Sequence, residues 1–285
     1  MAPPTAADFD LRVESLLACP RCHGRLALRS IELVCATCGV LGLIEDDIVR
    51  IGARERPSSF DATYQLMQRG NEGEGVRCLC YEQQTRFLER ELAPGMVVLD
   101  VGCGPSLSYT PPAGSLVIGL DPSIESLRQN RAVALRVHGT ATSLPLPTHS
   151  LDAILCFYSI HHMVGQSIRD THAAVLAALR EFARTLKRGG HLFIFEVRPW
   201  WPVWIAEQGA WNIARRLLGP RLDMYFWSAR ALSALARAAF HGTAPQIITF
   251  RVRPQTTFPP VFSLPWLTVP RFLYPFDATL YHVIA

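Results

Sequence analysis

The stretch VVLDVGCGPS, residues 97–106, places an acid near the end of an apolar run and follows it with two glycines. An apolar run that is nearly continuous is typical of a strand buried on both faces of a sheet. Glycines in the following turn let the backbone approach a ligand closely, and amide groups there can meet a polar or anionic group. Because many buried turns use Gly-x-Gly, the neighbouring sequence must show what this turn does.

Three further apolar runs follow, and segments with helical spacing of apolar residues separate them. The runs are residues 115–121, 151–160 and 191–197, and the helical segments are residues 123–131 and 169–186. Strands that alternate with helices predict an α/β fold with a doubly wound, mostly parallel sheet.

A second acid, Asp121, follows the apolar residues of VIGLDPS (117–123) and lies seventeen residues after Gly104. A carboxylate at the end of the second strand can accept hydrogen bonds from both hydroxyls of a ribose. Nicotinamide and adenosylmethionine cofactors both fit this arrangement. The second fits better, since Asp100 precedes the glycines and the pattern Gly-x-Gly-x-x-Gly is absent.

These motifs, with GTATSLPLPTHSLDAILCFYSIHHM (139–163) and LKRGGHLFIFEV (186–197), resemble the class I S-adenosylmethionine-dependent methyltransferases. They are most similar to the branch that includes the ubiquinone and menaquinone biosynthesis enzymes. The resemblance covers about residues 95–197 and implies a Rossmann-like sheet of seven strands, with S-adenosyl-L-methionine as the methyl donor. Residues 246–252 and 279–285 suit the last two strands of that sheet.

The resemblance also implies roles for individual residues. Those that it assigns to the cofactor are Asp100, Gly102 and Gly104 at the methionine end, Asp121 and Pro122 at the ribose and adenosine, Thr140 and Ala141 beside the adenine, and Cys156 and Phe157 facing the methyl donor. Thr140 departs from the family, which often has Asp there. The pair Pro111-Pro112 also departs from it, because proline cannot sit inside a regular helix. We therefore expect the first helix to be short or replaced by a loop.

His161 and His162 are the candidate catalytic bases, because an imidazole titrates near neutral pH. A base is needed only if the acceptor keeps its proton at that pH. The alternative for either histidine is a packing or capping role. Cys156 could act as a nucleophile, but it lies in an apolar strand, which favours a small core residue.

Four of the eight cysteines form one block, Cys19-x-x-Cys22 and Cys35-x-x-Cys38. Two such pairs can each hold one side of a tetrahedral ion, and thiolate ligands suit zinc, although an iron site would use similar ligands. The segment 15–52 resembles the small zinc-ribbon domain that is the activator subunit of tRNA and translation-factor methyltransferases and precedes many bacterial methyltransferases. We predict a structural zinc ribbon whose closed set of four ligands leaves no position for a substrate.

The predicted organisation is a zinc ribbon in residues 1–56, a helical linker in 57–94 and a methyltransferase domain in 95–285. Within the last domain, residues 199–227 and 253–278 are predicted insertions that shape the acceptor site. All six tryptophans lie between Trp200 and Trp266. Tryptophan and arginine at helical spacing favour a hydrophobic or aromatic acceptor and are compatible with a peripheral membrane contact.

The chain has 285 residues, 49% of them hydrophobic, and a formal net charge of +4. This composition excludes a disordered chain, and no apolar run reaches the length of a membrane span. Because the first residues lack a basic segment followed by an apolar one, we expect a cytoplasmic protein. The oligomeric state cannot be predicted from these features.

Two other functions compete with a methyltransferase of small molecules. Bacterial 23S ribosomal RNA guanine-N1 methyltransferases also place a zinc-binding module before this fold, but residues 19–38 hold only Arg21, Arg25 and Arg29 against Glu32, a weakly basic surface for phosphates. The other function is a non-catalytic adaptor that uses the ribbon to dock a partner.

Overall fold

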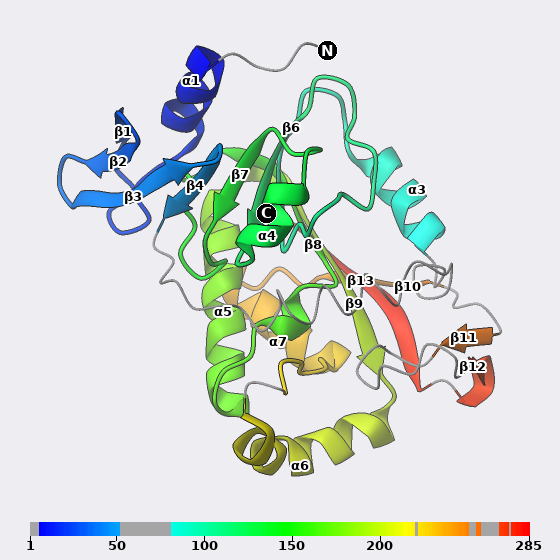
Figure 1. Ribbon diagram of the computed structural model, residues 1–285. Coiled ribbons are helices and arrows are strands. Elements are labelled where there is room, and N and C mark those ends of the chain that lie inside the picture. The colour runs from blue at the N-terminus through cyan, green and yellow to red at the C-terminus, as the bar shows by residue number, and fades with distance from the viewer. Residues whose placement is uncertain (1–5, 52–80, 220–221, 251–254, 258–267, 274) are drawn as a thin grey trace.

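A computed structural model describes residues 6–51, 81–219, 222–250, 255–257, 268–273 and 275–285 (Figure 1). Its main element is a mixed sheet flanked by helices. The strands of this sheet are β1 (Leu26–Arg29), β2 (Glu32–Cys35), β3 (Gly39–Glu45), β4 (Ile48–Ile51), β5 (Val97–Val101), β6 (Leu116–Asp121), β7 (Leu135–His138), β8 (Leu151–Phe157), β9 (Leu186–Pro199), β10 (Gln246–Phe250) and β13 (Phe276–Ile284). The predicted α/β class is confirmed.

The strand order places the glycine-rich turn in the middle of the sheet. Seven strands run in the order β7-β6-β5-β8-β9-β13-β10, and β13 is antiparallel to both of its neighbours. The order reverses at β5, which pairs in parallel with β6 on one side and β8 on the other. Ligands of open α/β sheets bind outside the carboxyl ends of the strands at such a reversal.

The prediction of seven strands is wrong in its count, because the sheet has eleven. The cysteine-containing strands β1 to β4 continue the same sheet, since β4 pairs in parallel with β7 through Ile48↔Arg136, Val49↔Val137 and Arg50↔His138. An edge strand offers unpaired backbone groups, and the N-terminal unit satisfies those of β7. The N-terminal strands β1 to β4 and the seven central strands therefore form one hydrogen-bonded sheet.

Helices cover both faces of the sheet. One face packs against α1 (Ala6–Leu16), α5 (Ile168–Thr185) and α7 (Ala229–Ala239), and α6 (Trp201–Leu218) adds Trp211 to that core. The other face packs against α3 (Tyr81–Glu91), and α4 (Ile124–Gln129) forms a small separate cluster with Ile48 and Cys103. Strand residues alternate between the two cores, as expected for strands buried on both sides.

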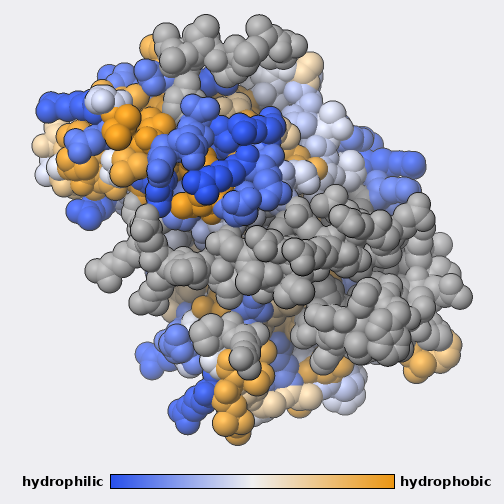
Figure 2. All heavy atoms as spheres, in the orientation of Figure 1, coloured by the Kyte–Doolittle hydropathy of each residue, from blue (hydrophilic) through white to orange (hydrophobic). Residues whose placement is uncertain are grey.

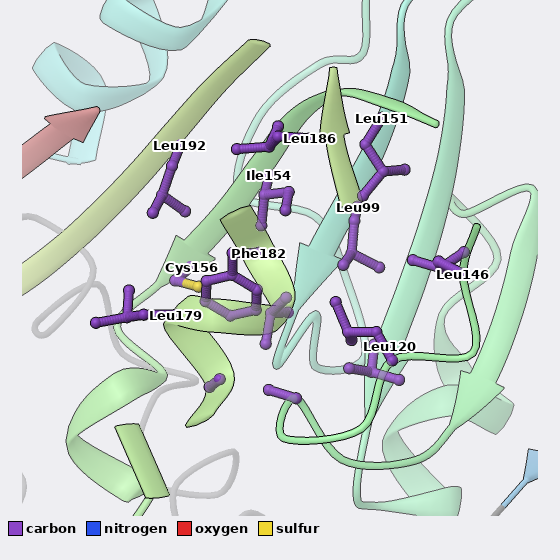
Figure 3. Packing of buried hydrophobic residues seen from close by; sticks show 14 of the residues in the cluster. Leu99, Leu120, Leu146, Leu151, Ile154, Cys156, Leu179, Phe182, Leu186 and Leu192 are labelled. Atoms are coloured by element: carbon purple, nitrogen blue, oxygen red, sulfur yellow. The ribbon is translucent and has the colours of Figure 1, made fainter. Parts of the chain in front are cut away.

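Helix α5 supplies the largest part of the core on its face of the sheet. Val175, Leu179 and Phe182 are fully buried at helical spacing, and Figure 3 shows Phe182 among strand residues such as Leu99 and Cys156. Ser167 caps the helix by accepting a hydrogen bond from the backbone of Asp170. The predicted helix, residues 169–186, agrees with α5 to within one residue at each end.

Other predicted elements agree with the structure where it describes them. No helix forms between residues 102 and 115, so a loop replaces the first helix as the prolines predicted. Two short strands, β11 (Gln255–Thr257) and β12 (Thr268–Pro270), pair beside the 3-10 helix η4 (Arg271–Leu273). Half of the predicted insertion 253–278, and the part of the predicted linker before residue 81, lie outside the described residues. None of the described helices combines the length and apolarity that a membrane crossing requires.

The buried position of Phe182 yields a stability prediction. Phe182→Ala removes a fully buried ring and should lower the free energy of unfolding by about 3–5 kcal/mol. Val40→Ala is the control, because Val40 is exposed and its truncation should change the free energy by less than about 0.5 kcal/mol. Urea unfolding followed by circular dichroism measures both, and equal effects would contradict the assigned core.

Candidate functional site

The turn after β5 is shaped by its glycines. Gly102 and Gly104 have φ of +70° and +57°, and a Cβ on Gly102 would lie 2.5 Å from the Cβ of Ser159. The turn is fixed to the next strand, since the amide of Gly102 donates to the carbonyl of Leu120 over 2.7 Å. A side chain at position 102 would therefore force apart the ends of β5 and β8.

Asp121 braces this turn from the end of β6. Its Oδ2 accepts a hydrogen bond from the amide of Gly104 at 2.9 Å, and its Oδ1 accepts one from the amide of Ser123 at 2.8 Å. Asn130 completes the brace by donating to the carbonyl of Gly104 at 2.9 Å. These bonds fix the carboxylate of Asp121 at the carboxyl end of β6, where the ribose of the cofactor was expected.

Asp100 lies next to Asp121 and is almost fully buried. Burial raises the pKa of Asp100 to about 7, and the carboxylate of Asp121 contributes to the increase. The Oδ1 atom of Asp100 and the hydroxyl of Tyr109 are buried without a hydrogen-bond partner among the described residues. Because a buried polar atom without a partner is costly, this carboxyl group is suited to a ligand that brings a donor or a positive charge.

Cys156 and Phe157 end β8 on opposite faces of the sheet. Cys156 is fully buried in the core beside α5, and burial raises the pKa of its thiol well above the usual range, with Asp100 and Glu196 adding to the shift. Phe157 belongs to the core beside α3 and packs against Phe195. Cys156 is thus a core residue between two carboxyl groups, which favours the packing alternative over direct chemistry at its sulfur.

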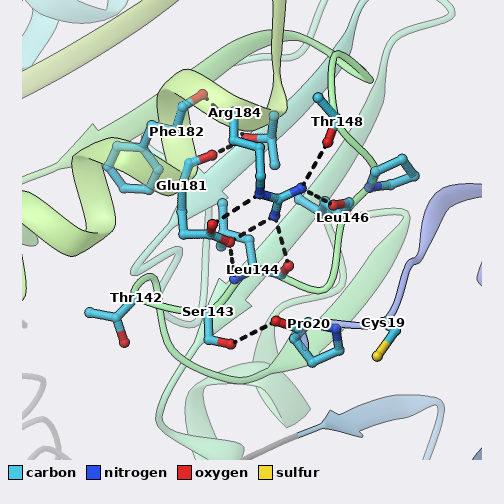
Figure 4. Close-up of polar contacts among 12 residues, drawn as sticks. Cys19, Pro20, Thr142, Ser143, Leu144, Leu146, Thr148, Glu181, Phe182 and Arg184 are labelled. Atoms are coloured by element: carbon cyan, nitrogen blue, oxygen red, sulfur yellow. Dashed lines mark hydrogen bonds and ion pairs between the residues drawn. The ribbon is translucent and has the colours of Figure 1, made fainter. Parts of the chain in front are cut away.

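Thr140 and Ala141 lie in the loop that follows β7, where the adenine was expected. Thr140 is exposed and Ala141 is buried. Figure 4 shows how this loop is held: Arg184 donates to the carbonyls of Leu144 and Leu146, and Glu181 accepts from the amide of Leu144 at 2.9 Å. The exposed residue Pro122 starts the neighbouring loop after β6.

The same loop contacts the N-terminal unit. The hydroxyl of Ser143 donates to the carbonyl of Pro20, between two of the cysteines, and the amide of Ala18 donates to the carbonyl of Pro145 at 3.0 Å. The cysteine-containing unit and the loop beside the expected adenine position are therefore in direct contact.

His161 is paired with a carboxylate that the sequence analysis did not single out. Its Nδ1 lies 2.8 Å from Oε2 of Glu196, and its backbone amide donates to Oε1 of Glu196 at 3.2 Å. Glu196 is 1% exposed at the carboxyl end of β9. With Glu196 as the acceptor of this bond, Nδ1 is the donor and Nε2 is the ring nitrogen that can accept a proton. The sequence contained one sign of this role, since Glu196 is an acid within the otherwise apolar run HLFIFEV.

His162 has a different environment, although the two imidazole rings are only 4.1 Å apart. Burial lowers the pKa of His162 well below its usual range, and His161 adds to the effect. Its Nδ1 donates to the carbonyl of Asp223 at 3.1 Å. His162 therefore stays neutral at pH 7 and ties the end of β8 to the segment between α6 and α7.

That segment, residues 222–228, covers the His161–Glu196 pair. The amide of Tyr225 donates to the carbonyl of His161 at 2.9 Å, and the ring of Phe226 lies 6.4 Å from that of His161. Glu207 on α6 accepts from the amide of Phe226, and burial raises the pKa of Glu207 to about 7. Aromatic rings and a buried carboxyl group thus adjoin the candidate base.

The four cysteines of the N-terminal block converge on one point. The sulfur atoms of Cys19, Cys22, Cys35 and Cys38 all lie within 4.8 Å of one another. Thiolates at about 2.3 Å from one tetrahedral ion would be about 3.8 Å apart, so the cluster fits a zinc ion. The amides of Arg21 and Cys22 donate to the sulfur of Cys19 at 3.4 and 3.5 Å and hold the first cysteine pair in its turn.

The cluster predicts one bound metal ion per chain. Cys35→Ser should abolish binding and lower the melting temperature, because metal binding contributes folding free energy. Cys156→Ala is the control, since Cys156 is buried elsewhere and should leave the metal content unchanged. Elemental analysis of purified protein gives the stoichiometry and separates zinc from iron, and equal metal contents in the two variants would contradict the site.

Comparison with known proteins finds one matching family and a number of relatives. Residues 99–194 match the family described as "Methyltransferase domain". An uncharacterised methyltransferase of Bacillus subtilis, YcgJ, is 34% identical over 110 residues, which cover 35% of this chain and 40% of that protein. The chain thus matches less than half of this relative's length.

Solved structures match this chain at lower identity. The crystal structure of YcgJ covers 72% of this chain and 95% of its own, with 20% identity and a TM-score of 0.45. The complex of the Haloferax volcanii Trm112 activator with a putative methyltransferase covers 81% and 99%, with 18% identity and a TM-score of 0.48. The geranyl diphosphate C-methyltransferase of Streptomyces coelicolor covers 71% and 75%, with 16% identity and a TM-score of 0.46. From the family match, together with the α/β sheet and its glycine-rich turn, we conclude that residues 99–194 form a methyltransferase domain.

Proposed function

We propose that this protein is an S-adenosyl-L-methionine-dependent methyltransferase that acts on a small hydrophobic or aromatic acceptor. The observation that carries the proposal is the pair Asp100 and Asp121 beside the glycine-rich turn. The buried, unpartnered Oδ1 atom of Asp100 suits the ammonium group of the methionine end, and Asp121 suits the ribose. The bound donor would supply an activated methyl group on a sulfonium.

The chemistry is a direct displacement. A lone pair of the acceptor forms the new bond to the methyl carbon while the carbon–sulfur bond breaks and its electrons stay on sulfur. Alignment of the reacting atoms contributes much of the rate. Nε2 of His161 would take the acceptor's proton, and Glu196 would hold the ring through Nδ1 and stabilise the imidazolium that forms.

The acceptor class follows from what surrounds His161. Phe226 packs against Phe276 with ring centroids 5.0 Å apart, and Tyr225 contacts Trp211 and Trp227 edge-on. Aromatic side chains near the candidate base favour binding of apolar or aromatic molecules over phosphate-rich ones. No observation favours a ribosomal RNA acceptor, and residues 6–51, which would have to bind it, hold seven acids and five arginines.

The pKa of Asp100 leads to a prediction about cofactor binding. The ionised carboxylate, which attracts an ammonium group, becomes dominant as the pH rises through about 7. If only this form binds, affinity for S-adenosylmethionine should increase roughly tenfold between pH 6 and pH 8. Isothermal titration calorimetry measures it, and Asp100→Asn should bind more weakly and lose the pH dependence.

The matched control for Asp100 is Asp10→Asn, since Asp10 is an exposed acid on α1 of the N-terminal unit and its variant should bind like the wild type. An Asp100→Asn variant that keeps the full pH dependence would show that another group is responsible. A folded wild-type protein that binds no S-adenosylmethionine would contradict the proposed function and favour the adaptor alternative.

The two histidines should differ in catalysis. Transfer of labelled methyl groups to small-molecule, lipid and RNA extracts identifies the acceptor, and for a proton-bearing acceptor His161→Gln should lower kcat about 100-fold with little change in donor affinity. Glu196→Gln should lower kcat and shift the pH–rate profile. His162→Gln is the matched control, because its Nδ1 is already used by Asp223.

Unchanged turnover in both His161→Gln and Glu196→Gln would remove the base from the mechanism while leaving the cofactor site intact. Labelling confined to the RNA extract, with strong salt dependence, would replace the small-molecule acceptor by RNA.

A further inference from the structure

Helix α6 has two faces with different surroundings. Its inner face carries buried Trp211, whose Nε1 donates to the carbonyl of Met224 at 3.0 Å, and Glu207, which holds Phe226. Its outer face carries an apolar stripe at spacings of four and eight residues: Trp201 is 74% exposed, Ile205 53%, Ile213 62% and Leu217 80%. Residues spaced in this way lie along one side of a helix. Figure 2 shows apolar atoms at the lower edge of the molecule, over the end of α6.

The apolar surface continues beyond α6. The amide of Trp200, at the start of the helix, donates to the carbonyl of Pro275 at 2.8 Å. This bond brings the chain after η4 against the start of α6, and η4 itself presents Phe272 and Leu273 at 74% and 58% exposure. We call Trp201, Ile205, Ile213, Leu217, Phe272 and Leu273 the α6 face. Exposed apolar side chains that line one helix face, with two more on η4, indicate an interaction site.

The last turn of α6 carries Arg215 and Arg216, and the stretch of sequence that contains the α6 face is basic in composition. Residues 198–285 contain nine arginines and three acids, a net charge of +6. Glu207 is used inside the fold, and Asp277 is paired with Arg198 at 3.0 Å. Arg216, which belongs to α6, is exposed beside the stripe. Helix α6 therefore combines an exposed apolar stripe with an exposed arginine and has its one acid, Glu207, bonded to Phe226, which suits a lipid surface with anionic headgroups above an apolar interior.

The N-terminal unit shows that exposed apolar residues alone do not have this character. Leu11, Ile31 and Val40 are 67%, 57% and 58% exposed. Residues 6–51, however, hold seven acids and five arginines, a net charge of −2. The N-terminal unit and α6 thus expose similar apolar side chains on segments of opposite net charge. Comparing the two therefore distinguishes the contribution of apolar residues to membrane binding from that of charge.

We propose that the α6 face docks on an anionic lipid bilayer, with α6 lying in the plane of the interface. The helix would bury its apolar stripe among the headgroups while the arginines meet lipid phosphates. The inner face of α6 would then hold the segment 222–228, which covers His161, next to the membrane. An apolar acceptor dissolved in the bilayer would reach the site from there. Docking itself does not depend on methyl transfer and is tested without it.

The test is co-sedimentation of the full chain with vesicles. Wild-type protein should bind equimolar phosphatidylglycerol and phosphatidylcholine vesicles at least about tenfold more tightly than pure phosphatidylcholine, and added salt should weaken binding. The double variant Ile213→Glu/Leu217→Glu should lose about tenfold or more of this affinity. The matched control Leu11→Glu/Val40→Glu adds the same charge to the N-terminal unit and should bind like the wild type.

Circular dichroism and the melting temperature check that both double variants fold. Absence of binding to anionic vesicles, or equal losses in the two double variants, would overturn the proposal. Sedimentation velocity without lipid tests whether a second copy of the chain covers the α6 face instead. A dimer that dissociates only in Ile213→Glu/Leu217→Glu, together with no vesicle binding by the wild type, would show this and overturn the proposal.

Discussion

The burial of Asp100 beside Asp121 is the constraint on which the central site depends. The two carboxyl groups lie near the ends of adjacent parallel strands. Asp121 accepts hydrogen bonds from the backbone amides of Gly104, in the turn after β5, and Ser123. Oδ1 of Asp100 is buried without a partner among the described residues, and burial raises the pKa of this carboxyl group because it disfavours the ionised form. A cationic ligand would offset this effect. The glycines matter because they let such a ligand reach both acids.

The N-terminal unit extends the sheet that carries this site. Strand β4 pairs with β7, and Ser143 and Pro145 of the loop after β7 contact the chain around the first cysteine pair. Arg184 and Glu181 hold the same loop from α5. Direct hydrogen bonds therefore connect the cysteine-containing unit to the edge of the sheet and to the loop expected beside the adenine. These elements are far apart in the sequence.

Helix α6 and the segment after it close the other side of the site. His161 and His162 each bond to this segment through the carbonyl of His161 and the imidazole of His162, so it is fixed over the end of β8. The buried face of α6 supports the segment, and the opposite face is apolar and exposed. One helix thus connects the surroundings of the candidate base to the outer surface of the molecule.

The sequence by itself determined the α/β class, the positions of the main strands and of α5, the loop in place of the first helix, and the grouping of the four cysteines. These features follow from local periodicity, proline chemistry and ligand spacing, which act over a few residues. Only the tertiary structure decided that the ribbon joins the sheet, making eleven strands, and that Glu196 rather than a nearby residue pairs with His161. Both depend on contacts between distant segments, edge pairing in one case and the register of β8 against β9 in the other. A local pattern does not encode such contacts.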